Sequence, residues 1–87
     1  MKSLIEKRQH RRNHISLEAT AVTPDGLIRQ NVLLVNLSRS GAMVELDESI
    51  QLPEAFTLLF NHSLEPCRVI WRAAKFAGVQ FEQILPE

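Results

Sequence analysis

The chain has 87 residues, a length that suits one domain with one modest core and excludes a second domain. Hydrophobic residues make up 45% and charged residues 23%, which is an ordinary globular composition, and no apolar run approaches the roughly 18 residues of a membrane span. The single cysteine excludes an internal disulfide and fits a reducing compartment, so we expect a cytoplasmic protein. The net charge is zero, but residues 1–14 hold five Lys or Arg against one Glu, which gives this segment +4 and the remainder −4.

The first 14 residues form a basic arm. Its stretch EKRQHRRNH, Glu6–His14, places four cationic side chains just ahead of the first alternating segment. Blocks of like charge repel one another, stay solvated and commonly bind anions, so we expect the arm to be flexible until a ligand neutralises it. Arg8 and Arg12 fall on one side of the backbone in both an extended and a helical arm. They therefore predict a pincer of two guanidinium groups.

Period-two alternation predicts short β-strands from Ile15 onward. Ile15–Ala21 alternates apolar and polar residues, and the turn sequence TPDG at 23–26 then predicts a hairpin that leads into a second strand at Leu27–Val35. Small polar residues interrupt this strand at Asn36–Gly41, NLSRSG, and alternation resumes over residues 42–46.

The second half of the chain continues in the same way. Phe56–Phe60 is a short apolar run, residues 61–63 form a turn, Cys67–Arg72 alternates, and a last strand contains GVQF. The alternation predicts that Trp71 faces the core. Six short strands with turn chemistry between them predict an all-β, antiparallel barrel over residues 15–87, because closing the sheet removes unpaired edges. No helix is predicted.

The residues offer no catalytic or metal-binding constellation. His10 and His14 are four apart and would share a helical face, but no third ligand completes a metal site. Cys67 lies at the start of an alternating strand, and His62 lies in a turn without an acidic or thiol neighbour at a useful spacing. We therefore expect neither an enzyme nor a cofactor.

Four motifs, in their order and spacing, resemble the PilZ domain family. They are RxxxR at Arg8–Arg12, (D/N)xSxxG at Asn36–Gly41, the aromatic strand Val69–Arg72 and the sequence GVQF at Gly78–Phe81. The resemblance runs from about residue 6 to residue 81. It implies a six-stranded antiparallel barrel that binds the bacterial second messenger cyclic di-GMP, with the arginine arm closing over the second motif. It also implies a bacterial cytoplasmic protein that signals to an unidentified partner of motility, pilus or polysaccharide machinery.

The implied ligand matches the chemistry of these residues. Cyclic di-GMP is a compact dianion, and each guanine presents O6 and N7 as a pair of acceptors for a planar guanidinium, so Arg8 and Arg12 are the expected primary contacts. The guanine N1 and N2 donors need acceptors, which the Asn36 carbonyl oxygen and the Ser38 hydroxyl can supply. Gly41 would permit a tight turn and a close backbone approach.

Two further arginines, Arg11 and Arg39, are expected as secondary ligand contacts, and Arg39 could reach a phosphate. Lys7 and Arg11 repeat the spacing of the pair one residue earlier, so the register of the arm has an alternative. We place the motif on Arg8 and Arg12 because both positions are then arginine, which alone offers bidentate geometry.

The chain departs from the family pattern at two places. Asn36 stands where many members have Asp, and an amide oxygen is a weaker acceptor than a carboxylate. Residues 83–87 are too short for the C-terminal helix that often follows the barrel, so we expect that helix to be short or absent.

Two other functions stay open. A PilZ-like module could act only through protein contacts without binding the ligand. A small barrel with a basic arm could also bind RNA or single-stranded DNA. Composition disfavours nucleic acid, because the chain has no Tyr, one Trp and four Phe mostly at core-phase positions, and the body is acidic.

Overall fold

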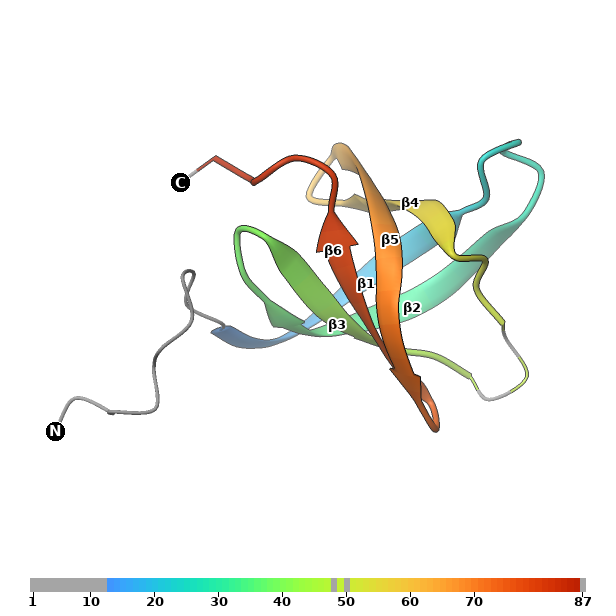
Figure 1. The fold of residues 1–87 in the computed structure, drawn as a ribbon, viewed down its shortest axis with the longest axis horizontal. Coiled ribbons are helices and arrows are strands. Elements are labelled where there is room, and N and C mark those ends of the chain that lie inside the picture. Colours follow the sequence, from blue (N-terminus) through green and yellow to red (C-terminus); the bar gives the residue numbers. More distant parts are fainter. Residues whose placement is uncertain (1–12, 48, 50, 87) are drawn as a thin grey trace, which may run out of the picture.

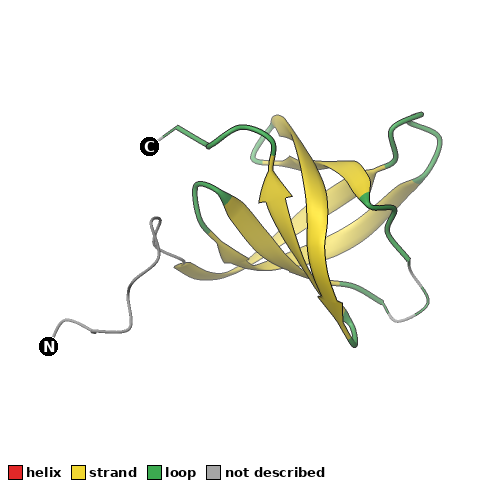
Figure 2. Ribbon diagram, in the orientation of Figure 1, coloured by secondary structure: helices red, strands yellow, loops and turns green. Residues whose placement is uncertain are grey.

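Six antiparallel strands close into a barrel (Figures 1 and 2). The computed structural model describes residues 13–47, 49 and 51–86. The strands are β1 (Asn13–Val22), β2 (Arg29–Leu37), β3 (Gly41–Glu45), β4 (Ala55–Phe60), β5 (Ser63–Ala73) and β6 (Phe76–Phe81). Around the barrel they follow the order β1, β2, β3, β6, β5, β4, and β4 pairs again with β1. The all-β barrel predicted from the alternation is confirmed.

Every second residue of the strands fills the barrel interior. In β2 and β4 the buried positions alternate with partly exposed ones, as the period of two requires. The buried hydrophobic residues form one cluster: Ala19, Ala21, Val32, Leu34, Val44, Leu52, Phe56, Leu58, Phe60, Cys67, Ala77, Val79 and Phe81. Because side chains occupy the interior of so small a barrel, a ligand has to bind on its outer face or at its ends.

No helix occurs in the part of the chain that the structure describes, and hence none that could cross a membrane.

The predicted turns are formed by the residues expected to form them. At the β1–β2 turn, Gly26 has φ of 76°, a conformation that glycine adopts without strain. The Asp25 carboxylate accepts hydrogen bonds from Thr23 Oγ1 at 2.6 Å and Leu27 N at 2.9 Å. These two hydrogen bonds lower the pKa of Asp25, the one from Thr23 most. At the β4–β5 turn, Asn61 and His62 have φ of 51° and 62°, as in a two-residue hairpin loop.

The two β-ladders in which Asn36 takes part, β1–β2 and β2–β3, are both irregular next to this residue. The register of β1 against β2 shifts between His14 and Leu17, and that of β2 against β3 shifts between Leu34 and Asn36. Such bulges twist a strand locally and change where its side chains point, and they are common beside functional sites.

A third irregularity, in β5, overturns one prediction. Val69 pairs with Val79 and Trp71 pairs with Gly78, so Ile70 is an extra residue on β5. This shift of one position moves Trp71 from the inward phase of Val69 to the outer face, where it is 38% exposed. The prediction that Trp71 is a core residue is therefore wrong.

Candidate ligand-binding site

The loop that joins β2 to β3 lies beside the first residues of β1. Asn13 pairs with Leu37, and His14 pairs with Asn36. Arg12 precedes Asn13 directly, and consecutive Cα atoms are only about 3.8 Å apart. The basic arm therefore joins the barrel next to the NLSRSG motif. The arginines expected to contact the ligand from this arm lie outside the described residues: Arg8, Arg11 and Arg12.

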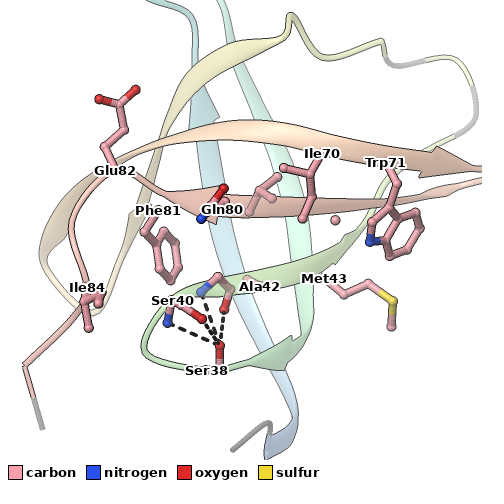
Figure 3. A pocket seen from close by; sticks show the side chains of 13 residues that line it. Ser38, Ser40, Ala42, Met43, Ile70, Trp71, Gln80, Phe81, Glu82 and Ile84 are labelled. Carbon is pink, nitrogen blue, oxygen red and sulfur yellow. Dashed lines mark hydrogen bonds between the residues drawn. The ribbon is translucent and has the colours of Figure 1, made fainter. Parts of the chain in front are cut away.

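The Ser38 hydroxyl stabilises the loop. Ser38 Oγ accepts hydrogen bonds from the backbone N–H of Ser40 at 3.3 Å and of Gly41 at 3.2 Å (Figure 3). Its own proton can go to the Gly41 carbonyl oxygen or to Ser40 Oγ, each 3.3 Å away. The Ser38 N–H also donates to the Gly41 carbonyl oxygen at 2.8 Å. The hydroxyl expected to accept from a guanine thus has partners within its own loop.

Asn36 carries an acceptor without a donor. The residue is 8% exposed, and within the described part of the chain its Oδ1 atom is buried and has no hydrogen-bond partner. Leaving a buried acceptor unsatisfied costs about 1–3 kcal/mol. An N–H donor brought to this atom, from a ligand or from the arm, would recover that energy.

Gly41 was expected to permit a tight turn and a close backbone approach. Its φ lies outside the left-handed region, so the turn itself does not demand glycine. Gly41 pairs with Gln80 on β6, and the carbonyl oxygen of Val79 occupies the space that a Cβ on residue 41 would take. The close backbone approach is therefore made by β6.

A trough of about 530 Å³ runs along the outer face of β3, β6 and β5 (Figure 3). This volume lies within the roughly 300–1,000 Å³ typical of small-molecule sites. At Gly41 and Gly78 the missing side chains let other groups approach the backbone, the Val79 carbonyl oxygen at Gly41 and the Trp71 indole at Gly78. We call this feature the outer trough, and its lining residues are Ser38, Ser40, Gly41, Ala42, Met43, Ile70, Trp71, Gly78, Val79, Gln80, Phe81, Glu82 and Ile84.

Of the expected site residues that the structure describes, the outer trough brings together Ser38 and Gly41 but not Asn36 and Arg39. Arg39 is directed instead to the C-terminal segment. Its Nε donates to the Leu85 carbonyl oxygen at 2.9 Å, and the Leu85 N–H donates to the Arg39 carbonyl oxygen at 2.7 Å.

The outer trough lacks positive charge of its own. Among its described lining residues Glu82 alone is charged, and Glu82 Oε2 lies 3.9 Å from Arg68 Nη2 on the neighbouring strand. An anion bound here therefore needs cations from elsewhere. Residues 1–12, which have five Lys or Arg against one Glu, precede β1 and supply +4.

Several lining residues were not predicted from the sequence. Ser40 lies inside the NLSRSG motif, two positions beyond Ser38, so the motif could have predicted that Ser40 lines the site. Gln80 occupies the outward phase of GVQF. Trp71 could be placed only with knowledge of the bulge at Ile70. Ile84 follows the last strand and carries no sequence signal.

The sole cysteine has no role at this site. Cys67 is buried in the core, and burial, followed by the negative charge of Glu82, raises the pKa of its thiol to about 12. The thiol is therefore protonated at neutral pH and is a poor nucleophile.

Comparison with known proteins agrees with this fold. The family model of the PilZ domain matches residues 6–87. The structure is similar to the crystal structure of the PilZ domain of CeSA from a cellulose-synthesizing bacterium, with a TM-score of 0.62 and 17% sequence identity over 82% of this chain and 79% of that chain. At this identity the likeness shows the fold alone. A search of curated proteins found no match.

Proposed function

Because the chain belongs to the PilZ domain family, a family of cyclic di-GMP receptors, we propose that it binds cyclic di-GMP as a sensor module. PilZ domains are typically non-catalytic receptors, and the inert thiol of Cys67 is in keeping with such a role. The proposed contacts are Arg8, Arg12, Asn36, Ser38 and Gly41, with Arg11 and Arg39 as secondary contacts.

The observation that carries the proposal is the register of β1 against β2. Because Asn13 lies opposite Leu37 and His14 lies opposite Asn36, the arm is attached beside Asn36 at the end of β2 and beside the loop that begins with Ser38. A dianion in the outer trough meets no described Lys or Arg in its lining, and the sequence of the arm carries the positive charge that such a ligand requires.

The unsatisfied acceptor of Asn36 gives the site its selectivity for guanine. The N1–H and N2–H₂ groups of guanine are donors, and Asn36 Oδ1 is a buried acceptor without a partner in the described chain. Binding satisfies that atom after the side chain turns toward the ligand. Arginine guanidinium groups take the O6 and N7 edge and the phosphate oxygens, which accept the same planar fork.

The signal is a change of surface. The ligand neutralises the basic arm and fixes it over the outer trough, which covers the face made by β3, β6 and β5. A partner protein of motility, pilus or polysaccharide machinery then recognises the altered face. Ordering the arm costs conformational entropy, which lowers affinity but makes the response switchable.

Calorimetry with purified protein and cyclic di-GMP tests the proposal. Arg12→Ala should weaken binding by about 1–3 kcal/mol, the size of one bidentate guanine contact. Arg29→Ala is the matched control, because it removes the same charge from the end of β2 that pairs with Val22, at the other end of the β1–β2 ladder from Asn13. Unchanged affinity in Arg12→Ala, or equal losses in both variants, would show that the arm does not grip the ligand.

The exposure of Trp71 also keeps single-stranded nucleic acid as a second candidate. An exposed indole can stack on a base, although Phe56, Phe60 and Phe81 are buried and add no further platform. A salt titration separates the two functions. Binding of RNA or single-stranded DNA should weaken steeply with salt as many phosphates release counterions, whereas one cyclic dinucleotide should give a shallow slope.

A further inference from the structure

The segment that follows β6 is fixed to the β2–β3 loop. Leu85 and Arg39 exchange two hydrogen bonds, Leu85 N–H to the Arg39 carbonyl oxygen at 2.7 Å and Arg39 Nε to the Leu85 carbonyl oxygen at 2.9 Å. Four residues before Leu85 and one residue after Arg39, the Phe81 N–H donates to the Ser40 carbonyl oxygen at 2.9 Å. The C-terminal segment is thus bound to the same loop that contributes Ser38 and Ser40 to the outer trough.

Consecutive side chains of this segment point in different directions. Leu85 is half-buried and packs against the core cluster. Ile84 is 55% exposed and lines the outer trough beside Ser38 and Ser40 (Figure 3). An exposed branched apolar side chain on the wall of a polar site gains stability when a flat apolar surface covers it, and both a purine face and a ribose edge offer such a surface.

We infer that Arg39 is a positioning residue of the binding site and that Ile84 is a ligand contact which Arg39 holds in place. This inference rests on the proposed function, because the occupant of the outer trough is taken to be cyclic di-GMP. It replaces a direct phosphate contact of Arg39 with an indirect role. By linkage, the ligand tightens the C-terminal segment to the same degree that the segment tightens the ligand.

A double-mutant cycle measured by calorimetry with cyclic di-GMP tests the inference. Ile84→Ala and Arg39→Ala should each weaken binding roughly five- to tenfold, which lies within the range expected when between one and two buried methylene groups lose their contacts. The double variant should bind no more weakly than the weaker of the two single variants, because both changes remove one contact. If the fold-losses of affinity in the two single variants multiply in the double variant, Arg39 contacts the ligand independently of Ile84. The inference would then be wrong.

Hydrogen exchange of the Leu85 amide gives a readout that does not depend on ligand. Without ligand, the Leu85 amide of the Arg39→Ala variant should exchange at least about tenfold faster than that of the wild-type protein. Ile84→Ala, a change on the surface, should leave the exchange rate of this amide unaltered. An unchanged exchange rate in Arg39→Ala would show that the Arg39 side chain does not hold the C-terminal segment, and it would overturn the inference even if affinity falls. Absence of heat when cyclic di-GMP is added to the wild-type protein would instead overturn the proposed function, and with it the contact assigned to Ile84. The exchange rates would still report whether Arg39 holds the C-terminal segment.

Discussion

The indole of Trp71 lies over Gly78 on the outer face of the barrel, so closely that a Cβ on residue 78 would overlap the ring. The two residues are paired across β5 and β6, and Gly78 leaves the space that the indole fills. Figure 3 shows Trp71 at the end of the outer trough opposite Ser38 and Ser40. The absence of one side chain on β6 thereby sets the position of the largest side chain on this face.

Gly78→Ala should displace the indole into water. Because Trp71 is partly exposed and can swing away, the substitution should cost only about 1 kcal/mol of unfolding free energy. Trp71 is the sole tryptophan of the chain, so a red shift of its fluorescence emission reports the displacement directly. Gln80→Ala, on the same outer side of β6, is the control and should leave the emission unchanged. An unshifted spectrum in Gly78→Ala would contradict the packing described.

Gly41→Ala should be more destabilising than Gly78→Ala. The atom that a Cβ on residue 41 meets is the backbone carbonyl oxygen of Val79, which can move only if β3 and β6 separate. The cost should be near the upper end of the roughly 1–3 kcal/mol typical of overpacking. Urea denaturation of the two variants gives the ranking, and a larger loss in Gly78→Ala would contradict it.

The strands of this barrel could be predicted from the sequence because its alternation has a period of two over most of the chain. The pattern fails where three successive residues are apolar. In Val69, Ile70 and Trp71 either phase is acceptable to a hydrophobic pattern, and the bulge is fixed only by pairing with β6. Trp71 was therefore placed on the wrong face.

The candidate site could be predicted only in part, for a similar reason. The residues of NLSRSG were recognisable as a polar loop. The partners of the Ser38 hydroxyl depend on the loop closing on itself, and no local pattern shows that Asn36 Oδ1 is buried without a partner among the described residues. The contact between Arg39 and Leu85 joins positions 46 residues apart, and no local pattern encodes such a pair.

Ala74→Gly should stabilise the protein. Ala74 lies in the β5–β6 turn with φ of 53°, a region that costs an alanine about 1 kcal/mol or more and a glycine little. The greater freedom of glycine in the unfolded chain offsets part of this gain, so we expect about 0.5 kcal/mol net. Thermal unfolding should show a melting temperature raised by a few degrees.

Ala73→Gly is the matched control for that change. Ala73 is the last residue of β5 and has ordinary backbone geometry, so glycine there should destabilise by roughly 0.5–1 kcal/mol. If both substitutions lowered the melting temperature, the strain assigned to Ala74 would be absent.

Glu82→Gln should tighten the binding of cyclic di-GMP. Glu82 is the charged residue on the described wall of the outer trough, where it repels a dianion and holds Arg68 at 3.9 Å. The neutral variant removes the repulsion and releases Arg68 toward the ligand. We expect affinity to rise about two- to fivefold at low salt, and the gain to shrink near 1 M salt, where the screening length is about 3 Å.

The control for this effect is Glu18→Gln, which removes the same charge from an exposed position of β1 outside the outer trough. The affinity of the Glu18→Gln variant for cyclic di-GMP should match that of the wild-type protein. A gain that persists undiminished at high salt would mean that Glu82 acts through something other than charge.

Cys67 should make the protein less stable in alkaline solution. The pKa of the thiol is raised from 9.0 to about 12 in the folded protein, mainly because the thiol is buried. Below pH 9 both states hold the proton, and this group gives no pH dependence. Between pH 9 and 12 the unfolded chain loses the proton and the folded chain keeps it, so the unfolding free energy falls by up to about 1.4 kcal/mol per pH unit.

Urea denaturation at pH 8 and at pH 10.5 measures this loss, and Cys67→Ala separates it from the titration of other groups. The variant starts with a lower stability because of the cavity that it creates, but it should lose less stability between the two pH values than the wild-type protein does. Reaction of the folded protein with a thiol reagent should be slow at pH 8 for the same reason, since little thiolate is present. Equal pH dependence of the two proteins would mean that the thiol titrates near its ordinary pKa and is reached by water in the folded state.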